Sequence, residues 1–150
     1  MAIEFPVVDV TGSDGSVAEA AWLARAEPVH RQLRTNLPAD YAARLRAVFA
    51  NGARMSVATE HEAVRGLALW RVVENTYEGR RLYVDDLVTD EAHRSRGVGR
   101  ALFHHLERHA RNVQCDVLAL DSGTQRTGAH RFYFREGMVI PSFCFRKNLK

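Results

Sequence analysis

Two glycines separated by one residue, Gly97 and Gly99, stand in an arginine-rich stretch that reads RSRGVGR over residues 94–100. Glycine lets the backbone turn sharply and present successive N–H groups with no side chain in the way. An amphipathic segment over residues 97–112 predicts a helix, so these N–H groups lie at a helix start, where unpaired donors and the helix dipole attract anions. The flanking arginines add full positive charges. Together these features predict a site that holds a diphosphate.

Two common nucleotide motifs do not fit this stretch. A P-loop requires Lys and then Ser or Thr after its last glycine, whereas Gly99 is followed by Arg100 and Ala101. The dinucleotide fingerprint requires a third glycine where Leu102 stands. What remains is the pattern R-x-x-G-x-G, which runs from Arg94 to Gly99.

This pattern, after the strand-like YVDDLVT and before an amphipathic helix, resembles the acetyl-CoA loop of the GNAT superfamily of N-acetyltransferases. The later run DSGTQRTGAHRFYFREGM, followed by FCFRKNL, is similar to the C-terminal half of the same family, especially to the small bacterial branch that includes aminoalkylphosphonate N-acetyltransferases. The resemblance covers about residues 82–147. It implies an α/β fold in a single domain over residues 1–150, with a mixed central sheet that is splayed at the acetyl-CoA site and flanked by helices.

The resemblance also implies acetyl-CoA as cosubstrate and assigns contacts to it. The pantetheine and the acetyl carbonyl meet the end of the strand, and the pyrophosphate meets the loop: Leu87, Val88, Thr89, Arg94, Ser95, Arg96, Gly97, Val98, Gly99 and Arg100. Many family members place an asparagine three residues before the alanine of the final helix. Counting back from Ala129 gives Arg126, which is expected either to contact a phosphate or an anionic substrate group, or to be a solvated loop residue.

Acetyl transfer to an amine makes demands on acids and bases, since the amine must lose a proton and the departing thiolate must gain one. Tyr133 matches the usual acid of the family. A phenol with a pKa near ~10 can protonate a thiolate of similar basicity. The alternative for Tyr133 is core packing, because FYF at a helix end is also typical of a core.

The candidate bases are Asp85 and Asp86, which are adjacent in a predicted strand. Alternation along a strand puts their side chains on opposite faces, so Asp86 is expected to share a face with Val84 and Val88, and only one carboxylate is expected to face the cleft. Asp86 is placed slightly ahead, and Glu74 at the end of the preceding strand is a third candidate. The alternative for each is a salt bridge with a nearby arginine.

Two histidines and two cysteines do not match a known site pattern. His105 and His109 have the i, i+4 spacing of a zinc-binding helix, but Leu106 stands where that motif requires Glu, so no metal is expected. Cys115 and Cys144 lack CxxC spacing and are expected to be reduced packing residues.

The elements that must position these residues follow from periodicity and turn signals. Strands are predicted at residues 3–10, 54–60, 63–74, 81–89, 117–120 and 142–148. Helices are predicted at residues 17–37 with an interruption at Pro28, at 38–51, at 97–112 and at 128–137. Pro38 is expected to be the first residue of the second helix, and the strand at 117–120 is expected to be buried on both faces because its residues are all apolar.

Composition limits the class of protein. The chain has 150 residues, 46% of them apolar and 26% charged, with a formal net charge of +3. That charge suits an anionic small molecule and is too small for a dedicated nucleic-acid binder. No signal peptide and no membrane span are expected, so the protein is expected in the cytoplasm.

The acceptor and the partners are less constrained. The expected reaction is direct attack of a small-molecule primary amine on acetyl-CoA. The alternatives are acetylation of a protein or peptide, an acyl-CoA-sensing module without catalysis, and a nucleic-acid-associated regulator. The resemblance by itself makes a homodimer the expected oligomer.

Overall fold

The computed structural model describes residues 4–150. Its elements, in chain order, are β1 (Val7–Asp9), α1 (Ala20–Leu33), α2 (Tyr41–Ala50), β2 (Arg54–Glu60), β3 (Ala63–Asn75), β4 (Gly79–Thr89), the 3₁₀ helix η1 (Glu91–His93), α3 (Val98–Asn112), β5 (Val117–Leu120) and α4 (Thr127–Arg135). The described residues form two compact units, an N-terminal unit of residues 4–119 and a C-terminal unit of residues 120–150. A single domain over the whole chain stays a prediction.

An open five-stranded sheet in the order β1-β2-β3-β4-β5 forms the centre of the fold. The first four strands pair with their sequence neighbours in antiparallel fashion. Strand β5 begins level with Arg80, because the Asp116 N–H donates to the Arg80 carbonyl at 2.7 Å. Its four residues span only about 13 Å, so they cannot reach Leu87–Thr89 at the far end of the eleven-residue β4. That end of β4 therefore runs past its neighbour.

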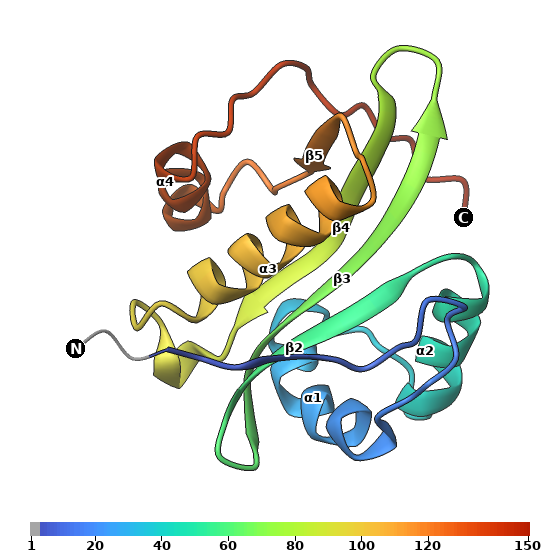
Figure 1. Ribbon diagram of the computed structural model, residues 1–150, viewed down its shortest axis with the longest axis vertical. Coiled ribbons are helices and arrows are strands. Elements are labelled where there is room, and N and C mark those ends of the chain that lie inside the picture. Colours follow the sequence, from blue (N-terminus) through green and yellow to red (C-terminus); the bar gives the residue numbers. More distant parts are fainter. Residues whose placement is uncertain (1–3) are drawn as a thin grey trace. The chain divides into compact units, whose positions relative to one another are not determined.

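Helices cover both faces of the sheet, with α1 and α2 on one face and α3 on the other (Figure 1). Strand β3 shows the two faces. Leu67 and Leu69 pack in the hydrophobic core with α1 and α2. On the opposite face, Gly66, the residue before Leu67, lies against Val98 and Leu102 of α3. The core on the α1 side is built from Leu23, Ala26, Val29, Tyr41, Leu45, Phe49, Met55, Val57, Leu67, Leu69 and Val88, together with smaller neighbours.

Helix α1 continues through Pro28, which was predicted to interrupt it. A proline removes one intrahelical hydrogen bond and leaves the carbonyl four residues earlier, that of Ala24, without its partner. Both residues are exposed, so water can satisfy that carbonyl. On the opposite side, Ala26 and Val29 are buried and hold the helix against the sheet. Tertiary packing therefore outweighs the local cost of the proline.

Helix α2 begins later than predicted. The Asp40 carboxylate accepts a hydrogen bond from the Ala43 N–H and caps the helix, so Tyr41 and not Pro38 is its first residue. Tyr41, Leu45 and Phe49 are buried at helical spacing, as the pattern predicted.

The strand predicted at residues 142–148 is not formed, and no regular structure follows α4 in the described chain. Phe143 is 84% exposed and Phe145 is 95% exposed. Cys144 is exposed as well, so it is not a packing residue. Alternating apolar residues predict a strand only if a neighbouring strand is there to accept their hydrogen bonds.

All four residues of β5 are partly buried, so the expectation that this strand is buried on both faces is wrong. Within the described residues, no helix has the length and apolarity needed to cross a bilayer.

Candidate functional site

Strand β4 carries a β-bulge at Asp85. Leu69 of β3 pairs with Asp86, and the next residue, Trp70, pairs with Val84, so Asp85 has no partner across the ladder. Residues paired in an antiparallel ladder share a face, and the extra residue of a bulge reverses the alternation. Val84 therefore lies on the α3 face with Trp70, whereas Asp86 lies on the α1 face with Leu69.

Because of the bulge, the two carboxylates do not lie on opposite faces of the sheet, as strict alternation along the strand predicts. Arg71 donates from Nε and Nη2 to Asp85 Oδ2 at 2.9 and 2.7 Å, and its Nη1 donates to the carbonyl of Asn51 at the end of α2. Asp86 contacts α1. Both carboxylates thus lie on the face covered by α1 and α2, and Asp86 does not share a face with Val84. Strict alternation along the sequence does not predict the extra residue, Asp85.

Asp86 is buried in a hydrogen-bonded network that joins three elements. His30 Nε2 of α1 lies 2.7 Å from Asp86 Oδ2, and the two side chains are only 2% and 6% exposed. Arg34 Nε donates to Asp86 Oδ1 at 2.7 Å. On the other side of the imidazole, Nδ1 lies 2.9 Å from the hydroxyl of Tyr41 in α2. With the Nε2 hydrogen donated to Asp86, Nδ1 can accept the Tyr41 hydroxyl hydrogen, so each group has a partner.

These contacts fix the charge of Asp86. Burial by itself raises the pKa of a carboxyl group, but the hydrogen bonds from His30 and Arg34 outweigh burial and lower the pKa of Asp86 below its ordinary value. Burial raises the pKa of Tyr41, so its hydroxyl keeps its hydrogen. Asp86 is therefore a carboxylate with both oxygens engaged, which makes it a weak base.

Asp85 has a different environment on the same face. Both hydrogen bonds from Arg71 go to Oδ2, and within residues 4–150 Oδ1 has no hydrogen-bond partner. The side chain is 25% exposed. Of the two adjacent carboxylates, Asp85 is the one with an oxygen open to a substrate or a water molecule.

His30 is the residue of this cluster that the sequence interpretation missed. It lies on the buried stripe of α1, one turn beyond Ala26 and two beyond Leu23. A histidine on an apolar stripe must find a polar partner, because an unpaired buried imidazole is costly. That position was the available signal, although the identity of the partner depended on the fold.

The glycine-rich loop forms a tight entry to α3. After η1, Arg94 is extended, Ser95 is left-handed with φ 61°, and Gly97 is left-handed with φ 94° directly before the helix. A Cβ built on Gly97 meets no atom within 4 Å, and Gly97 and Arg94 are exposed. The first N–H groups of a helix have no acceptor inside it, so this exposed entry fits an anionic oxygen at close range.

The three predicted arginines of the loop differ in their surroundings. Arg96 donates from Nη2 to Glu60 Oε1 at 2.9 Å and lies over the ring of Phe5. Glu60 also accepts from Arg65 Nε at 2.8 Å. Arg96 is thus part of an ion-pair cluster at the end of β2, whereas Arg94 and Arg100 are exposed.

Among the other predicted cosubstrate contacts, Val98 is 1% exposed and Val88 is 8% exposed. Their side chains belong to the interior, so only their backbone groups are available to a ligand. Leu87, Thr89 and Gly99 are partly buried, and Ser95 is exposed. The N-terminal unit therefore brings together the carboxylate pair, the uncovered end of β4 and the loop that follows it.

Tyr133 and Arg126 belong to the C-terminal unit. Tyr133 lies on α4 and is partly buried; burial raises its pKa, and the charge of Arg126 acts in the opposite direction. Arg126 is exposed at the start of α4, and its N–H donates to the carbonyl of Gly123 at 3.0 Å. Within this unit, the phenol and the guanidinium are therefore electrostatically coupled.

The histidines of α3 have structural partners. His105 Nε2 lies 2.9 Å from Asp9 Oδ1, and the His109 ring packs on Trp70 with 4.6 Å between ring centroids. Among residues 4–150, no three histidine, cysteine or acidic side chains form a group able to hold a metal ion.

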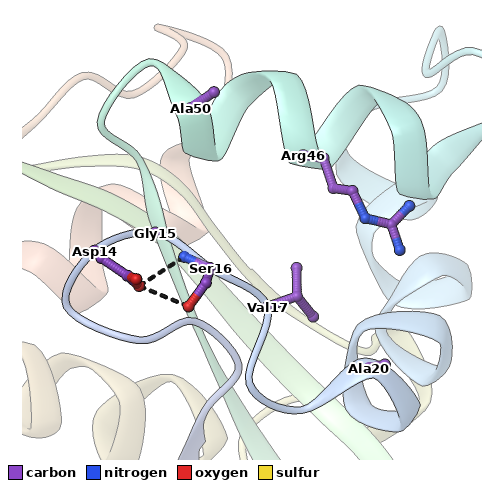
Figure 2. Close-up of a pocket in the computed structure, with 7 residues that line it drawn as sticks. All are labelled: Asp14, Gly15, Ser16, Val17, Ala20, Arg46 and Ala50. Atoms are coloured by element: carbon purple, nitrogen blue, oxygen red, sulfur yellow. Dashed lines mark hydrogen bonds between the residues drawn. The ribbon is translucent and has the colours of Figure 1, made fainter.

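A depression of about 520 Å³ lies between the turn after β1 and helix α2 (Figure 2). Its lining residues are Asp14, Gly15, Ser16, Val17, Ala20, Arg46 and Ala50. Gly15 lies against Arg54 at the start of β2, whereas the loop contacts Glu60 at the opposite end of that strand. The Asp14 carboxylate is occupied by the N–H and the hydroxyl of Ser16. This depression is therefore separate from the loop.

Comparison with known proteins identifies the family. The sequence model of the acetyltransferase (GNAT) family matches residues 17–138. The chain belongs to the GNAT family. This GNAT chain is 38% identical over 129 residues to the uncharacterized N-acetyltransferase YhdJ of Bacillus subtilis (strain 168), a match that covers 83% of this chain and 89% of that protein. The predicted class, an acetyl-CoA-dependent N-acyltransferase, is confirmed by these matches.

Solved structures share the fold of the GNAT chain. The aminoglycoside N-acetyltransferase AAC(6')-Iy, in complex with the bisubstrate analog CoA-S-monomethyl-acetylneamine, is similar with a TM-score of 0.80 at 15% identity over 99% of both chains. The ribosomal-protein-alanine N-acetyltransferase of Brucella melitensis is similar with a TM-score of 0.77 at 14% identity, over 97% of this chain and 99% of that one. The predicted mixed α/β fold is confirmed, and CoA complexes of such neighbours agree with acetyl-CoA as cosubstrate.

Proposed function

We propose that this GNAT protein transfers the acetyl group of acetyl-CoA to a primary amine of a small molecule by direct attack. The observation that carries the proposal is the order of features along β4 and the segment after it. A carboxylate with an open oxygen, Asp85, lies two to four residues before a strand end that β5 does not cover. The left-handed Gly97 then opens α3.

The pyrophosphate of acetyl-CoA binds the loop over residues 94–100. The exposed entry to α3 supplies N–H donors and the positive end of the helix dipole. Gly97 leaves room for a close oxygen, and Arg94 and Arg100 add charge. Leu87–Thr89 offer backbone groups to the pantetheine and to the acetyl carbonyl.

Asp85 and Asp86 have different roles on the acceptor side. Asp85 accepts a proton from the amine, directly or through water, by way of its open Oδ1. The amine nitrogen bonds to the thioester carbonyl carbon, the C–S bond breaks, and an amide and CoA are formed. Asp86, held by His30 and Arg34, keeps the bulged strand in place.

Tyr133 donates its phenolic hydrogen to the departing thiolate. Its raised pKa keeps the hydroxyl protonated, as this role requires. Arg126 contacts a phosphate of the cosubstrate or an anionic group of the acceptor.

The acceptor is a small amine. A structural neighbour named as an aminoglycoside acetyltransferase supports this class, and another named as a ribosomal-protein-alanine acetyltransferase represents the alternative. We also propose a cytoplasmic homodimer. Two free cysteines support the reducing compartment, and the exposed apolar side chains after α4 support self-association. Light scattering of the purified protein tests the dimer.

Calorimetric titration with acetyl-CoA, and then with CoA, tests the binding site. We expect both ligands to bind and Gly97→Glu to remove binding of both, because the new carboxylate would occupy the anion site. Gly52→Glu is the matched control, since Gly52 is also left-handed and open within 4 Å but lies at the end of α2. A panel of small amines and a peptide then tests the acceptor. Binding without turnover on the panel would favour an acyl-CoA sensor.

A further inference from the structure

We propose that Gln32 is a positioning residue for the acetyl-CoA loop. Its side-chain amide lies in the last turn of α1 and makes two contacts to the segment after β4. Nε2 donates to Asp90 Oδ1 at 3.1 Å, and Oε1 accepts from the Glu91 N–H at 2.9 Å. The inference rests on the proposed function, since it assumes that the loop binds the pyrophosphate.

Asp90 is the point through which Gln32 acts. Its N–H donates to the carbonyl of Arg65 at 2.8 Å, and its Oδ2 lies 2.9 Å from His93 Nδ1. Arg65 also donates to Glu60, which accepts from Arg96 of the loop. A continuous set of polar contacts therefore connects the end of α1 to the loop. Within this set, Asp90 is the residue that Gln32 of α1 contacts.

The shape of the loop requires such support. Ser95 has a β-carbon and a φ of 61°, a conformation that costs a non-glycine residue roughly tenfold in population. Strained conformations persist only when their surroundings hold them. The contacts of Asp90 hold the loop before Ser95, and the buried Val98 holds it afterwards. Gln32 is the side chain of α1 that binds Asp90 and so helps to hold the loop before Ser95.

Helix α1 contacts both parts of the proposed site. His30 of α1 and Arg34, the residue that follows this helix, bind Asp86 in β4, and Gln32 of α1 binds the segment that leads to the loop. The amide of Gln32 thus sets the loop relative to the strand that carries the carboxylate pair. Removal of Gln32 should leave the carboxylate network unchanged and should loosen the loop.

Gln32→Ala tests this role. We expect the Kd for CoA and the KM for acetyl-CoA to rise about three- to tenfold, which corresponds to one or two exposed hydrogen bonds. The kcat at saturating acetyl-CoA and the KM for the amine should stay within about twofold, because Asp85 and Asp86 keep their contacts. Arg25→Ala is the matched control: it removes a surface ion pair of the same helix, to Glu62, and should leave the Kd for CoA unchanged.

The outcomes separate this inference from the proposed function. If wild-type protein binds CoA and Gly97→Glu does not, the loop is the binding site, and an unchanged Kd in Gln32→Ala overturns only the role of Gln32. An equal rise in Arg25→Ala would assign the effect to general loosening of α1 and would also overturn it. If Gly97→Glu binds CoA as wild type does, the proposed function itself fails.

Discussion

His30 Nε2 lies 2.7 Å from Asp86 Oδ2 in the interior of the N-terminal unit, and the same imidazole contacts the Tyr41 hydroxyl through Nδ1. This pair joins α1 to β4, and Tyr41 extends the connection to α2. It also explains how a carboxylate that is only 6% exposed can be accommodated next to a proposed active site. A buried charge is tolerated when it is paired and hydrogen-bonded, and here His30 and Arg34 supply both.

The first prediction concerns the stability that His30 provides. His30→Ala should lower the free energy of unfolding by about 3–5 kcal/mol, because it leaves Asp86 Oδ2 and the Tyr41 hydroxyl without a partner and opens a cavity. Urea denaturation followed by circular dichroism measures this loss. Arg25→Ala on the exposed side of the same helix should cost less than about 0.5 kcal/mol. A loss of similar size in both variants would mean that the buried His30–Asp86 pair adds no more to the free energy of unfolding than a surface ion pair does.

The second prediction separates the two carboxylates. Asp85→Asn should lower kcat/KM about 100-fold while the Kd for acetyl-CoA stays within about twofold, because only the open Oδ1 serves as a base. Asp86→Asn should mainly lower stability, by about 2–3 kcal/mol, since it weakens the pairs with His30 and Arg34. Steady-state kinetics and urea denaturation of both variants make the comparison. A folded Asp86→Asn protein without turnover, beside an active Asp85→Asn protein, would assign the base to Asp86.

The third prediction concerns the proposed acid. Tyr133→Phe should lower kcat about 100-fold and leave the Kd for acetyl-CoA unchanged, because the ring is kept and only the proton donor is lost. Calorimetry and initial rates measure the two quantities. Tyr77→Phe is the control, since Tyr77 is exposed, its hydroxyl accepts a hydrogen bond from Arg81, and its loss should not affect turnover. Loss of acetyl-CoA affinity with normal kcat in Tyr133→Phe would show that Tyr133 has a packing or binding role.

Much of the fold follows from the sequence, because periodicity and turn residues act locally. The strands β2, β3 and β4, the helix α3 and the turn at Gly52 lie where their patterns place them within a few residues. The failures come from tertiary structure. Pro28 is tolerated because its exposed side meets water, and the strand predicted at 142–148 is absent because no neighbouring strand pairs with it.

In the candidate site too, the sequence predicts the local features and not those that depend on tertiary structure. The glycine-rich loop is visible in the sequence, since its residue types alone permit the left-handed entry to α3. The orientation of Asp85 and Asp86 is not visible, because a single unpaired residue in the β3–β4 ladder reverses the alternation. His30 comes from a helix more than fifty residues away, so its pairing with Asp86 depends on how α1 packs on the sheet.

The fourth prediction concerns the close approach of α3 to the sheet. A Cβ at Gly66 would lie 2.6 Å from Val98 Cγ1 and 2.9 Å from the Val88 carbonyl oxygen. Gly66→Ala should therefore push the start of α3 away from β3 and raise the Kd for CoA at least about fivefold, with a stability loss of about 1–3 kcal/mol. Calorimetry and urea denaturation measure both.

The control for this variant is Gly52→Ala. Gly52 is left-handed with φ 98°, so alanine there costs about 1 kcal/mol of stability by backbone strain but touches nothing within 4 Å. It should leave the Kd for CoA unchanged. If Gly66→Ala also bound CoA normally despite its loss of stability, the contact between Gly66 and α3 would not set the position of the loop.

The fifth prediction concerns pH and His109. Burial against Trp70 lowers the pKa of His109; the charge of Asp9 opposes this shift and that of His105 adds to it. As the pH falls, the unfolded chain binds the proton first, near the ordinary histidine pKa of about 6.5, so the stability that neutral His109 provides is complete above that value and is lost below it. His109→Gln should therefore lose less stability than wild type between about pH 7.5 and about pH 5.5. Urea midpoints from circular dichroism at both pH values measure this, with His61→Gln in the exposed β2–β3 turn as the control. Parallel curves for wild type and His109→Gln would show that packing on Trp70 leaves the protonation of His109 unaffected by folding.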